Sequence, residues 1–451
     1  MPSMIDNIRI NKKLITSVYS TSVYSIIGKI GGLSLPFLLA NMFGINAETD
    51  AFYFSYGVIL YLATIVSPAL EKIIVPYIAE KRNDRKNTNE MINNIIWISI
   101  IFIIILLIIV LVAMRLLIVH VLTRFSQENI NLSMNILLIV SPMAVMLVGS
   151  SIISGTLNAY KYFKYPAISP LVRFMVILVM IFILKRYLGI YSVAVGYSIG
   201  EIFRLLFLLY IANKKEVLTI KVGINYDKTL LPFFRSSIHQ IVASMFFGFT
   251  VIIDRIFAGT LDVGSLTLFH YAERIYFIPY TFITVGLIPV LLTHWGDKYN
   301  INYNRNSRML VTSVDRLLKK GLLPITIFIL LTVIISKYIT PILLFNKTNI
   351  TDDQITIIFY LFCILMIGLL PAIYGSLVTN GLIIIDKTKY ILYLAFLVFI
   401  IKPIITYIMI NILQLIGIAV SNVILHVLFF CSSYYLLIKT KAIPSANQDL
   451  T

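Results

Sequence analysis

The sequence predicts an all-α protein that crosses a membrane about twelve times. Hydrophobic residues make up 59% of the 451 residues and charged residues only 13%, whereas about a quarter of the residues in a soluble domain are charged. The apolar residues form continuous runs, such as residues 95–113, and a helix of about 20 such residues crosses a bilayer. Because the runs are long and rich in Ile and Leu, they predict helices and not the short alternating strands of a barrel.

The first apolar run follows the basic residues Arg9, Lys12 and Lys13, an arrangement shared with secretory signal peptides. The run is longer than the apolar core of a signal peptide and has no small-residue cleavage site, so we expect the first helix to be retained. Eleven further runs follow. In order, the expected helices cover residues 16–42, 51–77, 94–118, 132–156, 165–184, 189–211, 231–258, 264–292, 317–336, 355–382, 389–410 and 414–438.

Helix-breaking residues gather in the first, second and eighth of these helices. Gly and Pro bend membrane helices where neighbouring helices or cavity water satisfy the backbone. Such bends suit a protein that opens alternately to the two sides of a membrane, and ordinary Gly and Pro usage is the alternative interpretation. The residues are Gly28, Gly31, Gly32 and Pro36, then Pro68 and Pro76, then Pro279, Gly286 and Pro289.

The distribution of Lys and Arg predicts the orientation of the chain. The expected loops on one face contain 23 of these residues and those on the other face contain 5, so the positive-inside rule places both termini in the cytoplasm. Much of the net charge of +17 follows from this topology, and we expect no nucleic-acid partner. A polar loop separates six expected helices from six, which predicts two lobes, 1–212 and 231–451, joined by a cytoplasmic linker at 213–230.

The loops are too short to form a separate catalytic domain. The sequence contains neither a G-x-x-x-x-G-K-[ST] phosphate loop nor an H-E-x-x-H zinc motif. We therefore expect a monomeric transporter and not an enzyme, with no nucleotide, metal or other cofactor. A membrane glycosyltransferase or polymerase is the enzymatic alternative, and a large external loop would favour it. Coupling to Na⁺, to H⁺ or to the membrane potential stays open.

Charged residues inside the expected helices point to a polar interior. A charge at the bilayer centre costs about 2.5–3.5 kcal/mol, so these side chains are expected to face water or one another. The bases outnumber the acids by nine to five, which leaves a positive excess that an anionic substrate would neutralise. The bases are Lys29, Lys72, Arg115, Arg173, Arg204, Arg235, Arg255, Arg274 and Lys402, and the acids are Asp50, Glu71, Glu201, Asp254 and Glu273.

Some of these charges have a purely structural interpretation. Glu201 and Arg204 are three residues apart on one helix face and predict an ion pair. Arg115 and Lys402 fall near expected helix ends, so we interpret them as snorkelling to the membrane interface. In contrast, adjacent residues such as Asp254 and Arg255 point about 100° apart on a helix and are expected to reach different partners.

Five of the remaining bases are candidate ligands for an anion. Arg binds phosphate through two parallel hydrogen bonds, and Lys provides a movable point charge. A lipid-linked diphosphate fits this interior, and a soluble anionic solute fits the charge equally well. The candidate ligands are Lys29, Arg173, Arg235, Arg255 and Arg274, and the acids expected to compete with the anion for them and so permit release are Asp50, Asp254 and Glu273.

Three stretches of the sequence have the spacing of known family motifs. Residues 43–52 (FGINAETDAF) resemble an F-G-x-x-x-x-T-D-A-F signature, and residues 271–276 (YAERIY) with Pro279 resemble a Y-A-[DE]-R-L-x-x-x-P element. Residues 155–159 (GTLNA), with Phe163, Pro166 and Pro170, are similar to a G-x-L-N-A-x-x-x-F-x-x-P segment. In these three stretches the chain resembles the MviN/MurJ family of lipid II flippases. The resemblance spans residues 15–440. It implies two six-helix lobes in a V around a central cavity, a bacterial inner-membrane location, and a substrate carried on undecaprenyl diphosphate.

The sequence also departs from the family pattern. Lys29 stands where the family has an arginine, and Leu35 and Ala63 stand where it has two more, whereas Asp50, Glu273 and Arg274 match. These losses favour a flippase for the lipid-linked repeat unit of a surface polysaccharide, such as capsule or O antigen, and lipid II itself is the alternative. A small-solute antiporter of the same superfamily is less favoured, because its substrates are mostly cations.

Overall fold

The computed structural model describes residues 28, 31–32, 34–81, 84–121, 126–221, 223, 231–301, 307–344, 349–384 and 387–441. Across these residues the regular structure is helical and contains no β-strand, as the sequence predicts. The long helices are α2 (Ala47–Lys81), α3 (Arg85–Val121), α4 (Gln127–Val140), α5 (Pro142–Ala159), α6 (Lys164–Leu188), α7 (Tyr191–Lys214), α8 (Leu231–Gly259), α9 (Ser265–Ile301), α10 (Ser307–Leu343), α11 (Asp352–Ile367), α12 (Leu369–Ile384), α13 (Thr388–Leu413) and α14 (Leu415–Lys441).

Among the described residues, eight helical segments are long and apolar enough to cross a membrane, or nine if the bent pair α11 and α12 is one span. Two expected helices are each divided. The expected helix 132–156 is α4 and α5, interrupted where Pro142 cannot donate a backbone hydrogen bond. The expected helix 355–382 is α11 and α12, which bend by 41° at Gly368. The first expected helix, 16–42, lies mostly outside the described residues.

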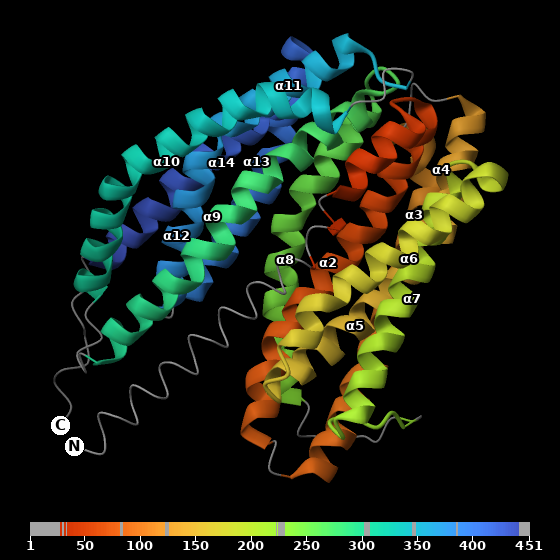
Figure 1. The fold of residues 1–451 in the computed structure, drawn as a ribbon. Helices are drawn as coiled ribbons and strands as arrows, with labels where there is room; N and C mark the ends of the chain where they lie inside the picture. Colours follow the sequence, from red (N-terminus) through yellow and green to blue (C-terminus); the bar gives the residue numbers. More distant parts are fainter. Residues whose placement is uncertain are drawn as a thin grey trace. The chain divides into compact units, whose positions relative to one another are not determined.

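The chain divides into two compact units (Figure 1). Unit 1 contains Met1–Leu39 and Ala47–Ser244, and unit 2 contains Ala40–Asn46 and Met245–Thr451. Helix α8 therefore contributes its first part to unit 1 and its last part to unit 2. The predicted linker at 213–230 stays a prediction, because residues 222 and 224–230 lie outside the described part of the chain.

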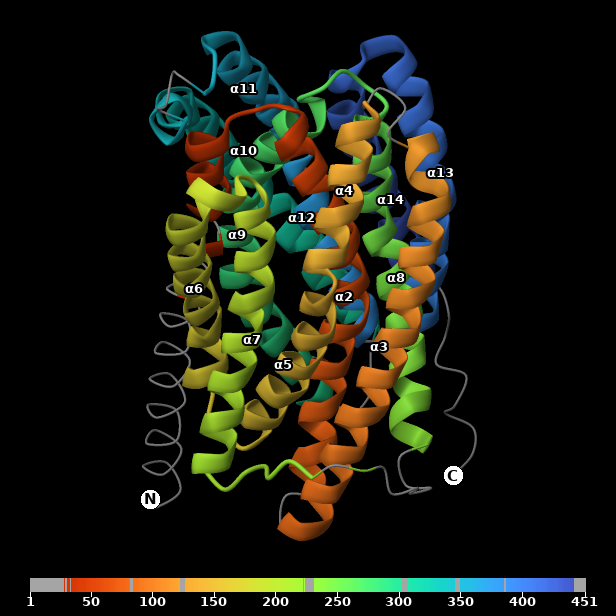
Figure 2. The ribbon, with the colours of Figure 1, turned by 90° about the vertical axis from the view of Figure 1, so that its right-hand side faces the viewer.

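Unit 1 is a bundle built around α2. Helix α2 packs against α4 and α5, and α6 packs along α7, as Figure 2 also shows. The aromatic side chains of Phe52, Tyr53 and Phe54 are almost completely buried in this bundle. At Gly155 a side chain would collide with Ile74 of α2, so this glycine permits the close approach of α5 to α2.

Unit 2 is a second bundle, in which α14 packs against α12 and α13 and α9 packs against α11 and α12. The segment Ala40–Asn46 is part of this unit. Asn41 donates to the carbonyl of Leu343 at 2.8 Å, and Asn349 donates to the carbonyl of Asn41 at 2.9 Å. Gly44 has a φ of +75°, and a Cβ at this position would lie 2.6 Å from the Asn349 carbonyl oxygen. The glycine of the FG motif is therefore required by both backbone conformation and space.

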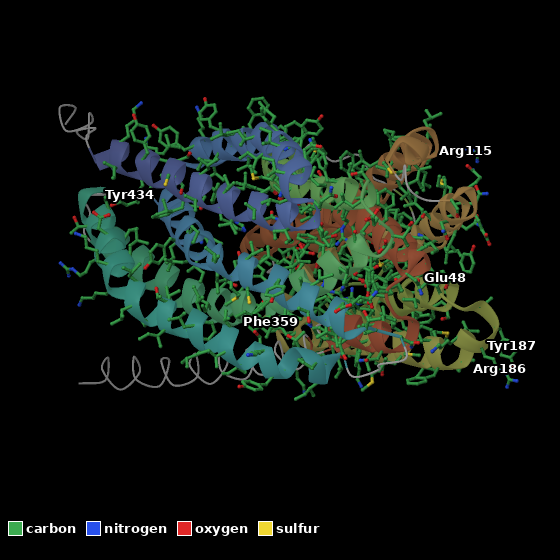
Figure 3. All side chains as sticks on the ribbon, turned by 90° about the horizontal axis from the view of Figure 1, so that it is seen from above. Glu48, Arg115, Arg186, Tyr187, Phe359 and Tyr434 are labelled. Carbon is green, nitrogen blue, oxygen red and sulfur yellow. The ribbon has the colours of Figure 1, made fainter. Side chains whose placement is uncertain are left out.

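Long rows of exposed apolar side chains cover α3, α6, α10 and α13, for example Ile109, Phe182, Leu323 and Ile404. In a protein with this many apolar helices, such rows face lipid. Arg186 and Tyr187 project outward from the end of α6, and Arg115 lies at the margin near the end of α3 (Figure 3). The exposed position of Arg115 agrees with the snorkelling interpretation.

Candidate functional site

Unit 1 contains a cluster of two arginines around one buried glutamate. Glu201, on α7, is 0% exposed, and its carboxylate oxygens lie 3.0 Å from Arg173 on α6 and 3.0 Å from Arg204 on α7. Arg204 also donates to the hydroxyl of Ser169 at 3.1 Å. The predicted pair of Glu201 and Arg204 is therefore confirmed, and Arg173 joins it.

This cluster has one more positive than negative charge. Arg173 retains 21% exposure of its side chain and Arg204 retains 13%, so Arg173 is the more accessible member. Its predicted role as a substrate ligand stays a prediction. The pairing with Glu201 shows that an incoming anion would have to share Arg173 with a carboxylate.

Two other acids of unit 1 have local structural explanations. Asp50 is buried in the first turn of α2, where a negative charge is favourable beside the positive end of the helix dipole. Glu71 accepts a hydrogen bond of 3.4 Å from Asn158, the asparagine of the GTLNA element. The predicted gating role of Asp50 stays a prediction.

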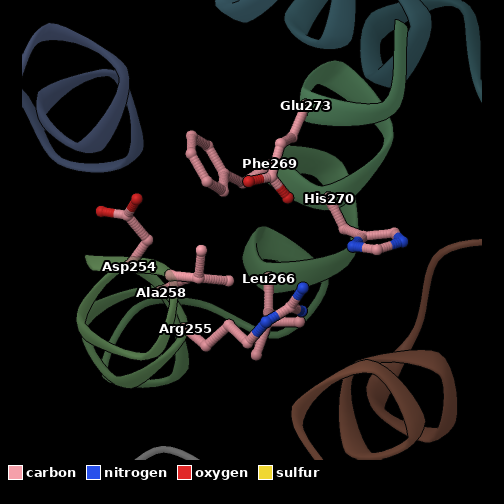
Figure 4. Close-up of a pocket in the computed structure, with 8 residues that line it drawn as sticks. Asp254, Arg255, Ala258, Leu266, Phe269, His270 and Glu273 are labelled. Atoms are coloured by element: carbon pink, nitrogen blue, oxygen red, sulfur yellow. The ribbon is translucent and has the colours of Figure 1, made fainter. Parts of the chain in front are cut away.

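Unit 2 contains the second charged cluster, in a small pocket between α8 and α9 (Figure 4). The pocket is lined by Val251, Asp254, Arg255, Ala258, Leu266, Phe269, His270 and Glu273. The free space inside the pocket is small, about that of a single water molecule. A larger polar group, such as a phosphate, therefore enters only when the lining side chains move apart.

Asp254 and Arg255 point to different sides of α8, as their adjacency predicts (Figure 4). The Asp254 carboxylate turns away from the pocket's basic residues, and its Oδ1 atom lies 2.6 Å from Nζ of Lys402 on α13. Lys402 is 0% exposed and sits in the middle of α13. The snorkelling interpretation of Lys402 is therefore wrong, because the helix extends well past this residue and other helices enclose the side chain.

The basic side of the pocket contains Arg255 and His270. Arg255 is 5% exposed and His270 is 2% exposed. His270 lies one helical turn before Arg274 on α9, and Nε of Arg274 is 3.3 Å from Nε2 of His270. The Arg274 guanidinium also lies 5.9 Å from the ring centre of Phe277. Two guanidinium groups from neighbouring helices therefore flank one imidazole.

The structure brings together four of the eight predicted site residues, namely Asp254, Arg255, Glu273 and Arg274, all on α8 and α9 of unit 2. Arg173 and Asp50 belong to unit 1. Lys29 and the side chain of Arg235 lie outside the described part of the molecule. Sequence reasoning missed His270, whose spacing of four residues from Arg274 was the available signal. It also missed Asn422 on α14, whose side-chain amide donates to Asp254 at 2.9 Å and which no sequence pattern marks.

Comparison of the sequence with models of known protein families identifies the family of this chain. The family model described as "Lipid II flippase MurJ" matches residues 39–449. The chain belongs to the MurJ family. Two of the stretches that resemble MurJ motifs have an observed structural role. Residues 43–52 include Gly44, which lies against Asn349, and residues 271–276 include Glu273 and Arg274 of the charged cluster on α9.

MurJ relatives are distant in sequence. A probable lipid II flippase MurJ of Buchnera aphidicola (Acyrthosiphon pisum) is 25% identical over 63% of this chain and 57% of the relative. Its counterpart from the Baizongia pistaciae strain is 24% identical over 83% of this chain and 74% of the relative. The lipid II flippase MurJ of Burkholderia cenocepacia is 22% identical over 62% of this chain and 56% of the relative. The chain spans 57% and 59% of the length of two of the Buchnera relatives that it matches.

Solved structures agree on the fold. A lipid II flippase MurJ in an inward closed conformation has a TM-score of 0.74, 21% identity, and coverage of 95% of this chain and 88% of that chain. An inward-facing multidrug resistance MATE transporter of the MOP superfamily has a TM-score of 0.72 and 16% identity, with coverage of 94% and 100%. The prediction of a multi-pass, all-α membrane protein with the fold of this superfamily is confirmed.

Proposed function

We propose that this protein is a flippase that moves lipid II, the undecaprenyl-diphosphate-linked precursor of peptidoglycan, across the bacterial inner membrane. The observation that carries the proposal is the MurJ family match over residues 39–449. The relatives that match are themselves described as lipid II flippases. These matches favour lipid II over the surface-polysaccharide repeat unit that the missing arginines at Leu35 and Ala63 suggested.

The pocket between α8 and α9 supports a role in binding the diphosphate. Arg255 and Arg274 come from neighbouring helices, and guanidinium groups bind phosphate oxygens in pairs. Asp254 forms an ion pair with Lys402, and both Asp254 and Glu273 interact electrostatically with Arg255. These two carboxylates would compete with the phosphate for the guanidinium groups, which would weaken binding enough to allow release.

Transport in this proposal follows alternating access. The basic residues of the α8–α9 cluster contact only the phosphate groups, while the sugar and peptide portion stays outside the pocket and the lipid tail stays in the bilayer. A membrane potential that is negative inside favours outward movement of the anion by about 2.3 kcal/mol per charge per 100 mV. Cytoplasmic termini and a monomeric state are part of the same proposal, as is the use of no nucleotide.

Complementation in two hosts tests the substrate. The chain is expressed in a bacterium depleted of its own lipid II flippase and, separately, in one that lacks its O-antigen flippase. We expect rescue of growth and of lipid II export in the first host and no restored O antigen in the second. Rescue of O antigen alone would overturn the lipid II assignment, and rescue in neither host would contradict the proposed function.

Charge variants connect that result to the pocket. Arg255→Ala and Arg274→Ala should each abolish rescue, while Arg115→Ala, at an exposed position on α3, should rescue like the parent protein. Full rescue by both arginine variants at equal protein level would show that neither Arg255, which lines the pocket, nor Arg274, which contacts His270 of the pocket, is needed to bind the diphosphate.

A further inference from the structure

A fully buried lysine lies among side-chain oxygens next to the α8–α9 pocket. The Nζ atom of Lys402 lies 2.6 Å from Oδ1 of Asp254. It donates to Oδ1 of Asn422 at 2.8 Å and to Oγ of Ser421 at 3.1 Å, both on α14. An ammonium group has three N–H donors, so the number of neighbouring oxygens equals the number of donors. These three oxygens are called the oxygen cage below.

The oxygen cage is held by its own hydrogen bonds. The amide nitrogen of Asn422 donates to Oδ2 of Asp254 at 2.9 Å, so Asn422 contacts the carboxylate with one end and the ammonium with the other. Thr406 donates to the Ser421 hydroxyl at 3.1 Å, and Ser421 donates to the carbonyl of Ile418 at 2.8 Å. The oxygens are therefore positioned by α8, α13 and α14 and not by Lys402 alone.

A contact between three helices does not need a buried charge pair. Removing an ammonium and a carboxylate from water costs several kcal/mol for each ion, and well-packed apolar side chains often stabilise such a contact equally well. The composition of the cage suggests another reason. A carboxylate, an amide oxygen and a hydroxyl are hard oxygen donors of the kind that bind hard metal cations. The ammonium group of Lys402 occupies the position that such a cation would take.

We propose that Lys402 is a built-in cation for the oxygen cage, so that the cage takes up no dissociable cation while this side chain is present. Shortening the side chain turns the cage into a site for a monovalent cation such as Na⁺. The proposal rests on the proposed function in one respect. Asp254 lines the pocket assigned to the diphosphate, and a tethered cation keeps the charge beside that pocket constant throughout transport.

Thermal unfolding of the purified full-length protein tests the cage without any transport assay. The melting temperature is measured in Na⁺ and in N-methylglucamine at equal ionic strength. The variants are Lys402→Ala, Lys402→Met, which fills the space without a charge, and Lys402→Ala combined with Asp254→Asn. A ligand that binds only the folded state raises the melting temperature with its concentration.

We expect the parent protein to show no difference between the two cations. Lys402→Ala should gain a Na⁺-dependent rise of several degrees, whereas Lys402→Met and the double variant should gain none. A Na⁺-dependent rise in the parent protein that Asp254→Asn removes would overturn the proposal, and so would folded Lys402→Ala that shows no Na⁺ response. If Lys402→Ala does not fold, the parent protein and its Asp254→Asn variant decide the question by the same criterion.

The same variants separate this inference from the proposed function. A Na⁺ response in Lys402→Ala together with failure to move lipid II in the parent protein would retain the built-in cation and contradict the flippase assignment. Lipid II movement in the parent protein together with no gained Na⁺ response would retain the flippase and overturn the built-in cation.

Discussion

Replacing Glu201 with Gln tests how far one buried carboxylate holds the arginine pair of unit 1. The substitution removes the carboxylate that lies 3.0 Å from both Arg173 and Arg204, and it leaves Glu71 as an acid that interacts electrostatically with Arg204. Breaking a buried ion pair by removing one partner costs about 3–5 kcal/mol. The two guanidinium groups retain 21% and 13% exposure, so water screens part of the repulsion, and we expect a loss near the lower end, about 3 kcal/mol.

The assay is thermal unfolding of the purified protein, with Arg173→Met as the matched control. This control leaves Glu201 paired with Arg204, so it should cost less, about 1.5–2 kcal/mol, at the lower end of the range for a hydrogen bond to a charged group. Adding Arg173→Met to Glu201→Gln should restore part of the lost stability, because it removes one of the two positive charges that have lost their shared carboxylate. A Glu201→Gln variant that unfolds no earlier than Arg173→Met, or a double variant that unfolds earlier than either single variant, would refute this reasoning.

Three other substitutions give equally specific expectations. Gly44→Ala should lower the free energy of unfolding by about 1–3 kcal/mol, because the position combines a φ of +75° with a carbonyl oxygen 2.6 Å from the new Cβ. The control Gly32→Ala, whose Cβ would meet nothing within 4 Å, should change the melting temperature little. Equal effects of the two substitutions would contradict the strain argument. Asn422→Leu should destabilise unit 2 by about 2–4 kcal/mol in thermal unfolding, because it removes hydrogen bonds to a buried carboxylate and to a buried ammonium group. An unchanged melting temperature would show that these hydrogen bonds do not stabilise the fold. In a direct binding measurement, Arg255→Lys should bind lipid II more weakly than the parent protein but more tightly than Arg255→Ala, because Lys retains the charge and loses the paired hydrogen bonds. Equal affinity of all three proteins would show that Arg255 does not contact the substrate.

Local sequence patterns predicted the helices and some of the charge pairs. Continuous apolar runs mark helices because the bilayer requires every backbone group to be bonded within the segment. The pair of Glu201 and Arg204 was visible because residues three apart share a helix face. The opposed directions of Asp254 and Arg255 followed from the same geometry.

Partners distant in sequence were not predictable in this way. Lys402 reaches Asp254 across 148 positions. The expected helix 389–410 already extended eight residues past Lys402, but no local pattern marks a partner on another helix. The packing of Ala40–Asn46 into unit 2 depends on contacts with Leu343 and Asn349, some 300 residues away. Such contacts follow from tertiary packing, which hydrophobic periodicity does not encode.

The breaks inside two expected helices had a visible signal that the apolar pattern concealed. Pro142 begins α5, and Pro371 lies in the first turn of α12. Each proline lacks the N–H that would continue the preceding helix. The surrounding residues are so uniformly apolar that a run of hydropathy passes through both breaks.

Reconstituted translocation is the most direct test of the central claim that this protein moves lipid II. Fluorescent lipid II is placed in proteoliposomes containing the purified full-length protein, and its exposure at the outer surface is followed with an impermeant quencher. An undecaprenyl-diphosphate-linked O-antigen unit is assayed in parallel as the alternative substrate. We expect rapid movement of lipid II, which Arg255→Ala and Arg274→Ala abolish, and little movement of the O-antigen unit. Movement of the O-antigen unit without movement of lipid II would contradict the central claim.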